Sequence, residues 1–384
     1  MREKGLAGSF WPTPRQKLLL QAALAEGDES AAAWRRLRPE LDLDEVEPGS
    51  YPLLPLLFRR LEQHAGDEPL LPRLKGMYRR TWYVNQLRLD RLLPALVSLQ
   101  ETGAEPLVVS GWELACRYYD DLGLRPVRGL HAFIRPERVG QSLELLRASG
   151  WQGELEPSPA ALRSRHAAWL ADGDGNDFVL HWRPFHEFVS PEGGLDELWA
   201  EAIDFRLGDA TARTLCPSDE LLNVCLSGAR SSPWQNLQWL ADAVVVLRTA
   251  GGEIDWGRVV AQATSRFATL RLRDALVYLR TTVGAPVPPE VLGELERVPT
   301  SRRERLAHRA GAWSGTRLGR APESLTRYLR ATANSSAPRA LAQLPEFLRE
   351  EWGLERRSQV PLTAARKAAT RLVNPVRAAA RAGR

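Results

Sequence analysis

The residues best suited to chemistry lie within residues 107–135 of the 384-residue chain. Ser110 and Gly111 follow a short apolar run, and Arg125 and Arg128 precede a second one. Backbone N–H groups beside a glycine and guanidinium groups are common phosphate-binding donors. No lysine lies in this stretch, so a phosphate would be held by these arginines and by N–H groups near Gly111. We therefore take these four residues as the candidates for nucleotide binding.

Two predicted strands and a short helix position these donors. Residues 107–109 are apolar and mostly β-branched and lie between a proline and a glycine, which predicts a buried strand. Residues 112–120 can form a short helix. Residues 130–134 alternate with period two and end before Pro136, which predicts a second strand. The stretch is therefore expected to form a strand–helix–strand platform.

The order of motifs along the chain resembles the DNA polymerase β nucleotidyltransferase superfamily, and within it an uncharacterised bacterial nucleotidyltransferase family. Sequences of that family contain, in this order along the chain, roughly LLKG, a Tyr-rich helix, RPxxDIDLLV, DLHW, LxPEDLLL, WLAD and IDW. The resemblance covers roughly residues 50 to 295. It implies an α+β fold: a small mixed β-sheet of nucleotidyltransferase type with helices on it, flanked by N-terminal and C-terminal helical subdomains. The similar segments are 109–111, 118–120, 124–126, 180–182, 215–222, 239–242 and 254–256.

The chain departs from the family at the positions that carry the chemistry. The resemblance aligns the Asp-x-Asp of the second strand with Gly129 and His131, and the Asp of DLHW with Val179. The lysine before the family's glycine is Ser110 here. Two-metal nucleotidyl transfer needs oxygen ligands around Mg²⁺, whereas a neutral imidazole suits softer transition metals. We therefore predict that the fold is present, that it has no metal site, and that catalysis is absent.

The family resemblance, together with the missing carboxylates, gives three candidate functions. The favoured one is a catalytically degenerate family member that acts as a binding or accessory protein for a nucleotide or a protein partner. The alternative is an active Mg-dependent enzyme that moves a nucleoside monophosphate from an NTP to a small molecule, sugar or peptide, using other carboxylates. A third is an accessory protein attached to a membrane or polyanion by its tail. The carboxylates that could serve the active alternative are Asp120, Asp121, Asp174 and Asp177.

The remaining histidines and one acidic loop do not form a metal-binding pattern. His181 and His186 would face opposite sides of a strand, and they lack the spacing of a helical zinc motif. Residues 172–177, DGDGND, separate two apolar runs and have the composition of a hairpin turn. This loop lacks the glycine and glutamate of a calcium-binding EF-hand. His181 is therefore expected to be a structural or pocket histidine.

Charge is divided unevenly along the chain. The formal net charge is +5, but residues 301–384 hold 18 Lys and Arg against 6 Asp and Glu, which leaves 34 against 41 for residues 1–300. The acidic balance of the main body argues against specific nucleic-acid binding by the core. Residues 356–384 contain eight basic residues and no acid, so this tail could contact a polyanion or an anionic membrane surface.

Cysteine use and hydropathy predict a cytoplasmic protein. Cys116, Cys216 and Cys225 have no C-x-x-C spacing and suit a reducing compartment. No apolar run reaches the ~18 residues of a membrane span, and the N-terminal residues do not have the pattern of a signal peptide.

Composition and periodicity divide the chain into four predicted regions. From Leu195 onward the pattern is almost uninterruptedly helical, and residues 299–325 mix Arg with Gly, Ser and Pro as linkers do. The regions are a helical region at 1–103, a nucleotidyltransferase-like α/β core at 104–216, a helical subdomain at 217–298, and a basic linker and tail at 299–384.

Overall fold

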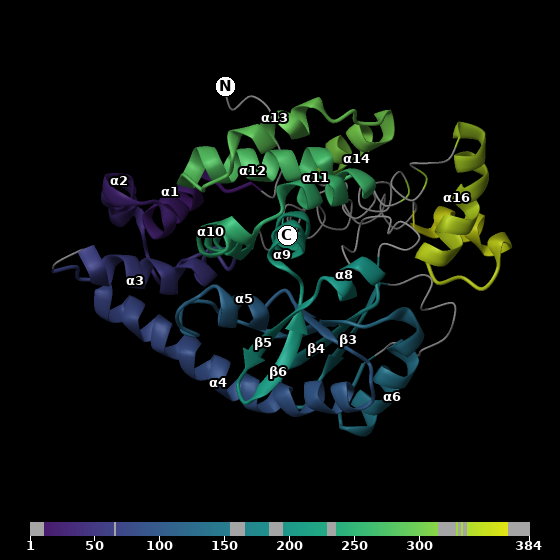
Figure 1. Cartoon of the computed structure of the whole chain (residues 1–384), viewed down its shortest axis with the longest axis horizontal. Coiled ribbons are helices and arrows are strands. Elements are labelled where there is room, and N and C mark those ends of the chain that lie inside the picture. Colours follow the sequence, from purple (N-terminus) through teal and green to yellow (C-terminus); the bar gives the residue numbers. More distant parts are fainter. Residues whose placement is uncertain are drawn as a thin grey trace, which may run out of the picture. The chain divides into compact units, whose positions relative to one another are not determined.

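The chain forms two units, each with its own set of helices. The computed structural model describes residues 11–64, 67–153, 166–183, 195–228, 236–313, 328, 332 and 336–367. The first unit comprises residues 1–155 and 167–333, and the second comprises residues 156–166 and 334–384. The sheet and most of the helices belong to the first unit (Figure 1).

A mixed β-sheet lies in the first unit, with strand order β3-β4-β2-β1-β6-β5. Strand β1 pairs antiparallel with β2 and parallel with β6, and β2 pairs parallel with β4. Hairpins β3–β4 and β5–β6 form the two edges. The mixed sheet confirms the predicted fold class. The strands are β1 Leu107–Val109, β2 Gly129–Phe133, β3 Ala167–Ala171, β4 Asp177–His181, β5 Ile203–Leu207 and β6 Ala210–Thr214.

Helices surround this sheet and make up most of the described chain. In the first unit they are α1 Pro14–Leu24, α2 Gly27–Leu37, α3 Leu54–His64, α4 Leu71–Glu101, α5 Trp112–Arg117, α6 Val139–Ala148, α8 Asp196–Ala200, α9 Pro217–Gly228, α10 Gln238–Thr249, α11 Trp256–Ser265, α12 Thr269–Val283, α13 Pro289–Arg297 and α14 Arg302–Trp313. The second unit contains α16 Ala337–Glu351. Short 3₁₀ turns are η1 Arg38–Glu40, η2 Tyr51–Leu53, η3 Pro136–Arg138, η4 Gly251–Glu253 and η5 Arg357–Gln359.

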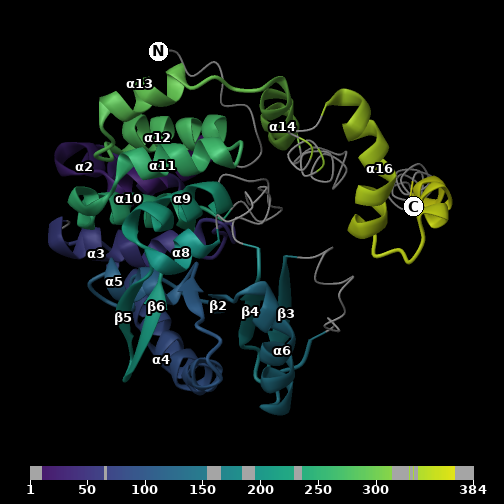
Figure 2. The ribbon, with the colours of Figure 1, turned by 45° about the vertical axis from the view of Figure 1, so that its right-hand side comes forward.

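The N-terminal helices and the helices after the sheet pack into one layer. Helix α1 contacts α3, α10 and α12, while α9 contacts α10, α11 and α12. Figure 2 shows this group of helices on one side of the sheet. Every residue of α9 from Pro217 to Leu226 is buried, as expected for a helix at the centre of such a layer. This layer faces the end of the sheet where β1 and β2 meet their neighbouring loops.

The β5–β6 hairpin contradicts the expectation of nearly continuous helix after Leu195. Its strands follow a period of two, since Phe205 and Leu207 are buried while their neighbours Asp204 and Arg206 are exposed. Gly208 makes the turn with a φ of +58°, a conformation that glycine adopts without strain. The alternation was present in the sequence, but it is short and lies between two helical patterns.

The predicted linker at 299–325 is also wrong where the structure describes it. Helix α14 spans residues 302–313, and it buries Ala307 and Glu304. Residues 314–327 lie outside the described residues. Near the C-terminus, residues 360–367 are helical. The tail from residue 368 onward lies outside the described chain.

Cys116, Cys216 and Cys225 are free thiols. Among the described helices, none combines the length and apolar character needed to cross a membrane.

Candidate functional site

The turn between β1 and α5 has a strained conformation that an internal carboxylate supports. Ser110 has a φ of +62°, which is uncommon for any residue except glycine. The next residue, Gly111, donates its N–H to the Glu113 side chain, with both carboxylate oxygens at 3.0 Å. This N–H is therefore already bonded, and the predicted use of it for phosphate does not fit the structure.

Helix α4 holds the loop that precedes β2. The Asn85 amide donates to the carbonyls of Leu122 and Arg125 and accepts from the Val127 N–H. Arg88 donates to the Val127 carbonyl. These bonds satisfy the polar backbone of a loop that has no regular partner strand. The loop therefore presents residues 125–128 in a fixed conformation.

Arg125 and Asp242 join this loop to helix α10. The guanidinium Nε and an Nη bind the two carboxylate oxygens at 2.8 and 2.9 Å, and each side chain is only 6% exposed. The Tyr119 hydroxyl donates to the same carboxylate at 2.8 Å. Burial disfavours the guanidinium charge, but Asp242 outweighs this effect and raises the pKa of Arg125. Arg125 is thus a positively charged group already neutralised by an internal partner.

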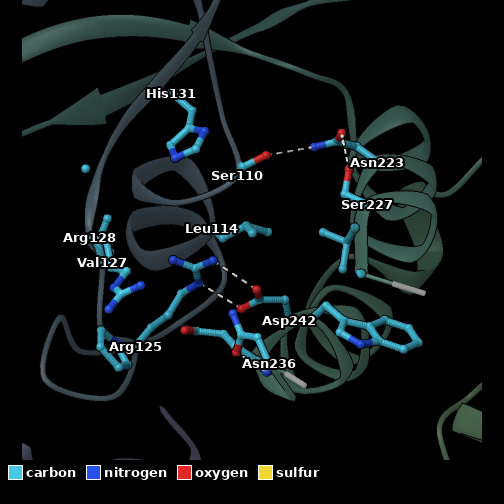
Figure 3. A pocket seen from close by; sticks show the side chains of 16 residues that line it. Ser110, Leu114, Arg125, Val127, Arg128, His131, Asn223, Ser227, Asn236 and Asp242 are labelled. Carbon is cyan, nitrogen blue, oxygen red and sulfur yellow. Dashed lines mark hydrogen bonds and ion pairs between the residues drawn. The ribbon is translucent and has the colours of Figure 1, made fainter. Parts of the chain in front are cut away.

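A cavity of about 320 Å³ lies between this loop and the helices α9 and α10 (Figure 3). One wall comes from the loop and β2, and the opposite wall comes from α9, α10 and Asn236, which lies two residues before α10. Ser110 lies between the walls, and its hydroxyl accepts from the Asn223 amide at 3.4 Å. The lining residues are Ser110, Leu114, Arg125, Pro126, Val127, Arg128, Gly129, His131, Asn223, Val224, Ser227, Gly228, Asn236, Gln238, Trp239 and Asp242.

The three positions aligned with the family's catalytic carboxylates lie side by side. Strands β2 and β4 pair in register, with Gly129 opposite Asp177 and His131 opposite Val179. A Cβ atom at residue 129 would collide with the Asp177 carbonyl and approach the Asp177 Cβ to 2.8 Å. No side chain fits at residue 129 unless the two strands separate. Gly129 therefore could not be replaced by a carboxylate without moving β4.

The crowding at this position gives a direct prediction. Gly129→Ala should lower the free energy of unfolding by about 1–3 kcal/mol, because the added methyl group overpacks the β2–β4 contact. Gly140→Ala in helix α6 is the control, since a Cβ there meets nothing within 4 Å. That variant should be neutral or stabilise by about 0.5–1 kcal/mol. Urea denaturation measures both, and equal stability of the two variants would contradict the crowding.

His131 and His181 form a pair on the same face of β2 and β4. The His131 Nδ1 and the His181 Nε2 are 3.0 Å apart, so one nitrogen donates to the other, and the rings stack with centroids at 5.3 Å. The described part of the chain contains no cluster of three or more His, Cys, Asp or Glu side chains suited to a metal ion. His186 lies outside that part. A glycine, an imidazole and a valine at the motif positions do not fit Mg²⁺, which requires oxygen ligands.

Arg128 gives the cavity lining a positive charge. It lines the cavity, and no ion pair to it occurs among the described residues. Arg88 lies near Arg128 but does not line the cavity; burial lowers the pKa of Arg88, the Arg128 charge lowers it further, and Asp177 acts in the opposite direction. The charge that an anion in the cavity would meet is therefore that of Arg128.

Two carboxylates are buried beneath the turn. Glu113 and Glu220 are both completely buried. Burial raises the pKa of Glu113 to about 7, against the opposing effects of Arg125 and of the N–H bond from Gly111. Burial, followed by the nearby Glu113, raises the pKa of Glu220 well above its usual range. Burial in this fold therefore stabilises the protonated form of each of the two side chains.

The structure brings most of the sequence-predicted residues together and adds a second wall. Ser110, Arg125, Arg128, Gly129 and His131 line the cavity, whereas Gly111 and Val179 do not. The alternative carboxylate Asp121 is occupied elsewhere, because it accepts from Tyr78, Arg59 and the Gly123 N–H. The sequence patterns predicted no part in the site for α9 and α10, although the WLAD segment that contains Asp242 is one of the family-like motifs. The residues that these patterns missed are Leu114, Pro126, Val127, Asn223, Val224, Ser227, Gly228, Asn236, Gln238, Trp239 and Asp242.

The mixed sheet, with a cavity beside β2, is consistent with a fold of the nucleotidyltransferase type. A family model described as uncharacterised nucleotidyltransferase matches residues 52–284, and the chain belongs to this family. The match confirms the resemblance drawn from the motifs. No curated protein matches the chain.

Proposed function

We propose that this chain binds a phosphorylated ligand, in the first instance a nucleotide, and does not transfer a nucleotidyl group with Mg²⁺. The register of β2 and β4 carries this proposal. The positions at which the family places its metal-binding carboxylates hold Gly129, His131 and Val179, and the first of them has no room for a side chain. A cavity that Gly129 and His131 help to line lies beside them.

The lining of the cavity supports an anionic ligand. Arg128 supplies a charge that no described carboxylate pairs with, and the single carboxylate in the lining, Asp242, is neutralised by Arg125. Hydroxyl and amide groups provide the remaining polar surface, and such neutral groups can bind phosphate and sugar oxygens without a metal. The neutral donors and acceptors are Ser110, Asn223, Ser227, Asn236 and Gln238.

Thermal unfolding with ATP, CTP, GTP or UTP, each with and without Mg²⁺ or Mn²⁺, tests this function. A ligand at 100 times its Kd adds about 2.7 kcal/mol, so we expect a rise in Tm of several degrees that does not require metal. Incubation with α-labelled nucleotides should transfer no label. A shift that appears only with metal, or metal-dependent transfer of label, would instead indicate an active enzyme and overturn the proposal.

Arg128→Ala should weaken nucleotide binding by about tenfold or more, because a charge-assisted hydrogen bond contributes roughly 1.5–3 kcal/mol. Isothermal titration calorimetry measures this change. Arg36→Ala is the matched control, since Arg36 is exposed on helix α2 and does not line the cavity. Equal affinity of the two variants would exclude Arg128 from the site.

A further inference from the structure

One face of helix α4 exposes large apolar side chains to solvent. Tyr83 and Leu87 are 59% and 52% exposed, and Trp82, which borders them, is 46% exposed. Residues four apart in an α-helix lie on the same face, so Tyr83 and Leu87 form a continuous apolar surface. Helix α4 runs along the edge of the first unit in Figure 1. Exposed aromatic groups gathered in this way mark interaction sites more often than isolated apolar residues do.

The same face has charges of opposite sign at its two ends. Residues 71–89 contain five basic residues and no acid. At the N-terminal end of the face, Arg79 and Arg80 are exposed, and neither has an ion pair with a described residue. Asp90 follows Leu87 at helical spacing and is also exposed. Arg91, the next residue, is also exposed and pairs with Asp172 at 3.1 Å. The face is therefore basic at its N-terminal end and apolar at its centre, and at its C-terminal end Asp90 is the charge that no described residue pairs with.

A hollow lies beside the acidic end of the face. Its volume is about 170 Å³, and α4 contributes Asp90, Arg91, Pro94, Ala95 and Ser98 to its lining. Asp172 closes another side and is paired with Arg91 at 3.1 Å. Asp90 is therefore the carboxylate of this hollow that remains for an arginine side chain from outside.

We propose that this face binds the same face of a second copy of the chain, with the two α4 helices antiparallel about a two-fold axis beside Asn85. This arrangement places Tyr83 of one copy opposite Leu87 of the other, because both are equally distant from the axis. It also places the Arg80 end of each copy opposite Asp90 of the other. An isologous contact needs this self-complementarity, in which each end of the patch matches the opposite end.

The self-complementary charge pattern selects a second copy over other partners. A nucleic acid or an anionic membrane would match the basic end but would be repelled by Asp90. The residue types agree with a protein contact, because Tyr, Trp and Arg are the residues that contribute most to such interfaces. A contact built on one pair of helices is small, so micromolar affinity is expected.

Sedimentation velocity of the full chain tests the proposal. Between roughly 1 and 100 μM the average mass should rise from the 42.9 kDa of the chain towards twice that value. Leu87→Glu should raise the dimer Kd by about tenfold or more, because it introduces a charge into the apolar centre. Leu306→Glu is the matched control, since Leu306 is 51% exposed but lies on α14. A monomer at every concentration, or equal effects of the two variants, would overturn the proposal.

Charge reversal tests the antiparallel register itself. Arg80→Asp and Asp90→Arg should each weaken the dimer, because each places like charges opposite one another. The double variant should restore association to near the original level, since it exchanges the two signs. Circular dichroism checks that the helix content is unchanged in every variant. Failure of the double variant to recover, with folding intact, would exclude this register.

Discussion

Replacing Arg125 with alanine should lower the free energy of unfolding by about 3–5 kcal/mol, the largest loss that we expect from a single substitution in this chain. The substitution leaves the Asp242 carboxylate charged and 6% exposed, with the Tyr119 hydroxyl as its remaining partner. An unpaired buried charge costs far more than the net contribution of the pair itself. Urea denaturation at pH 7 gives the measurement.

Two further variants show whether the loss comes from the buried pair. Arg73→Ala is the control, because Arg73 binds Asp44 with side chains that are 49% and 76% exposed, and such surface pairs contribute about 0–1 kcal/mol. The double variant Arg125→Met with Asp242→Leu should recover much of the stability, since it removes both buried charges. If Arg125→Ala were no worse than Arg73→Ala, the pair would not hold the loop to α10.

The second large effect is a decrease in stability as the pH rises from about 4.5 to about 7. Glu113 has a pKa raised to about 7 by burial, so in this range the folded chain keeps a proton that the unfolded chain releases. By linkage, stability then falls with increasing pH, by about 1.4 kcal/mol per unit and about 3 kcal/mol over the range. The raised pKa of Glu220 adds to the same decrease.

Glu113→Gln tests this pH dependence. The amide is neutral at every pH, and its oxygen can still accept the Gly111 N–H. The variant should therefore be more stable than the wild type above pH 7 and should show a flatter profile of unfolding free energy against pH. Glu296→Gln, at an exposed position on α13, should leave the profile unchanged. A profile for Glu113→Gln that follows the wild type would show that Glu113 is ionised in the folded state without cost.

The local part of the site could be predicted from the sequence, and the long-range part could not. Ser110, Arg128 and His131 lie next to recognisable strands, so their neighbourhood follows from local patterns. The partnership of Arg125 with Asp242 spans 117 residues, and nothing in the composition of α10 indicates which loop it meets. The WLAD segment was recognised as a motif, but its role as a cavity wall depends on the packing of α10.

The fold was predictable to a similar extent. The β3–β4 hairpin carries a strong turn composition and was predicted, whereas the β5–β6 hairpin has only a single glycine at Gly208 between short strands. The crowding at Gly129 depends on the exact register of β2 against β4, which the sequence of either strand does not specify.

The bridge between Arg125 and Asp242 also determines how a ligand can enter. It joins the two opposite walls of the cavity, so the walls cannot move apart as two hinged domains would. Much of the conformational entropy of assembling the site is then lost during folding instead of during binding. We expect association in a single kinetic step, with a rate linear in ligand concentration and no slow closing phase.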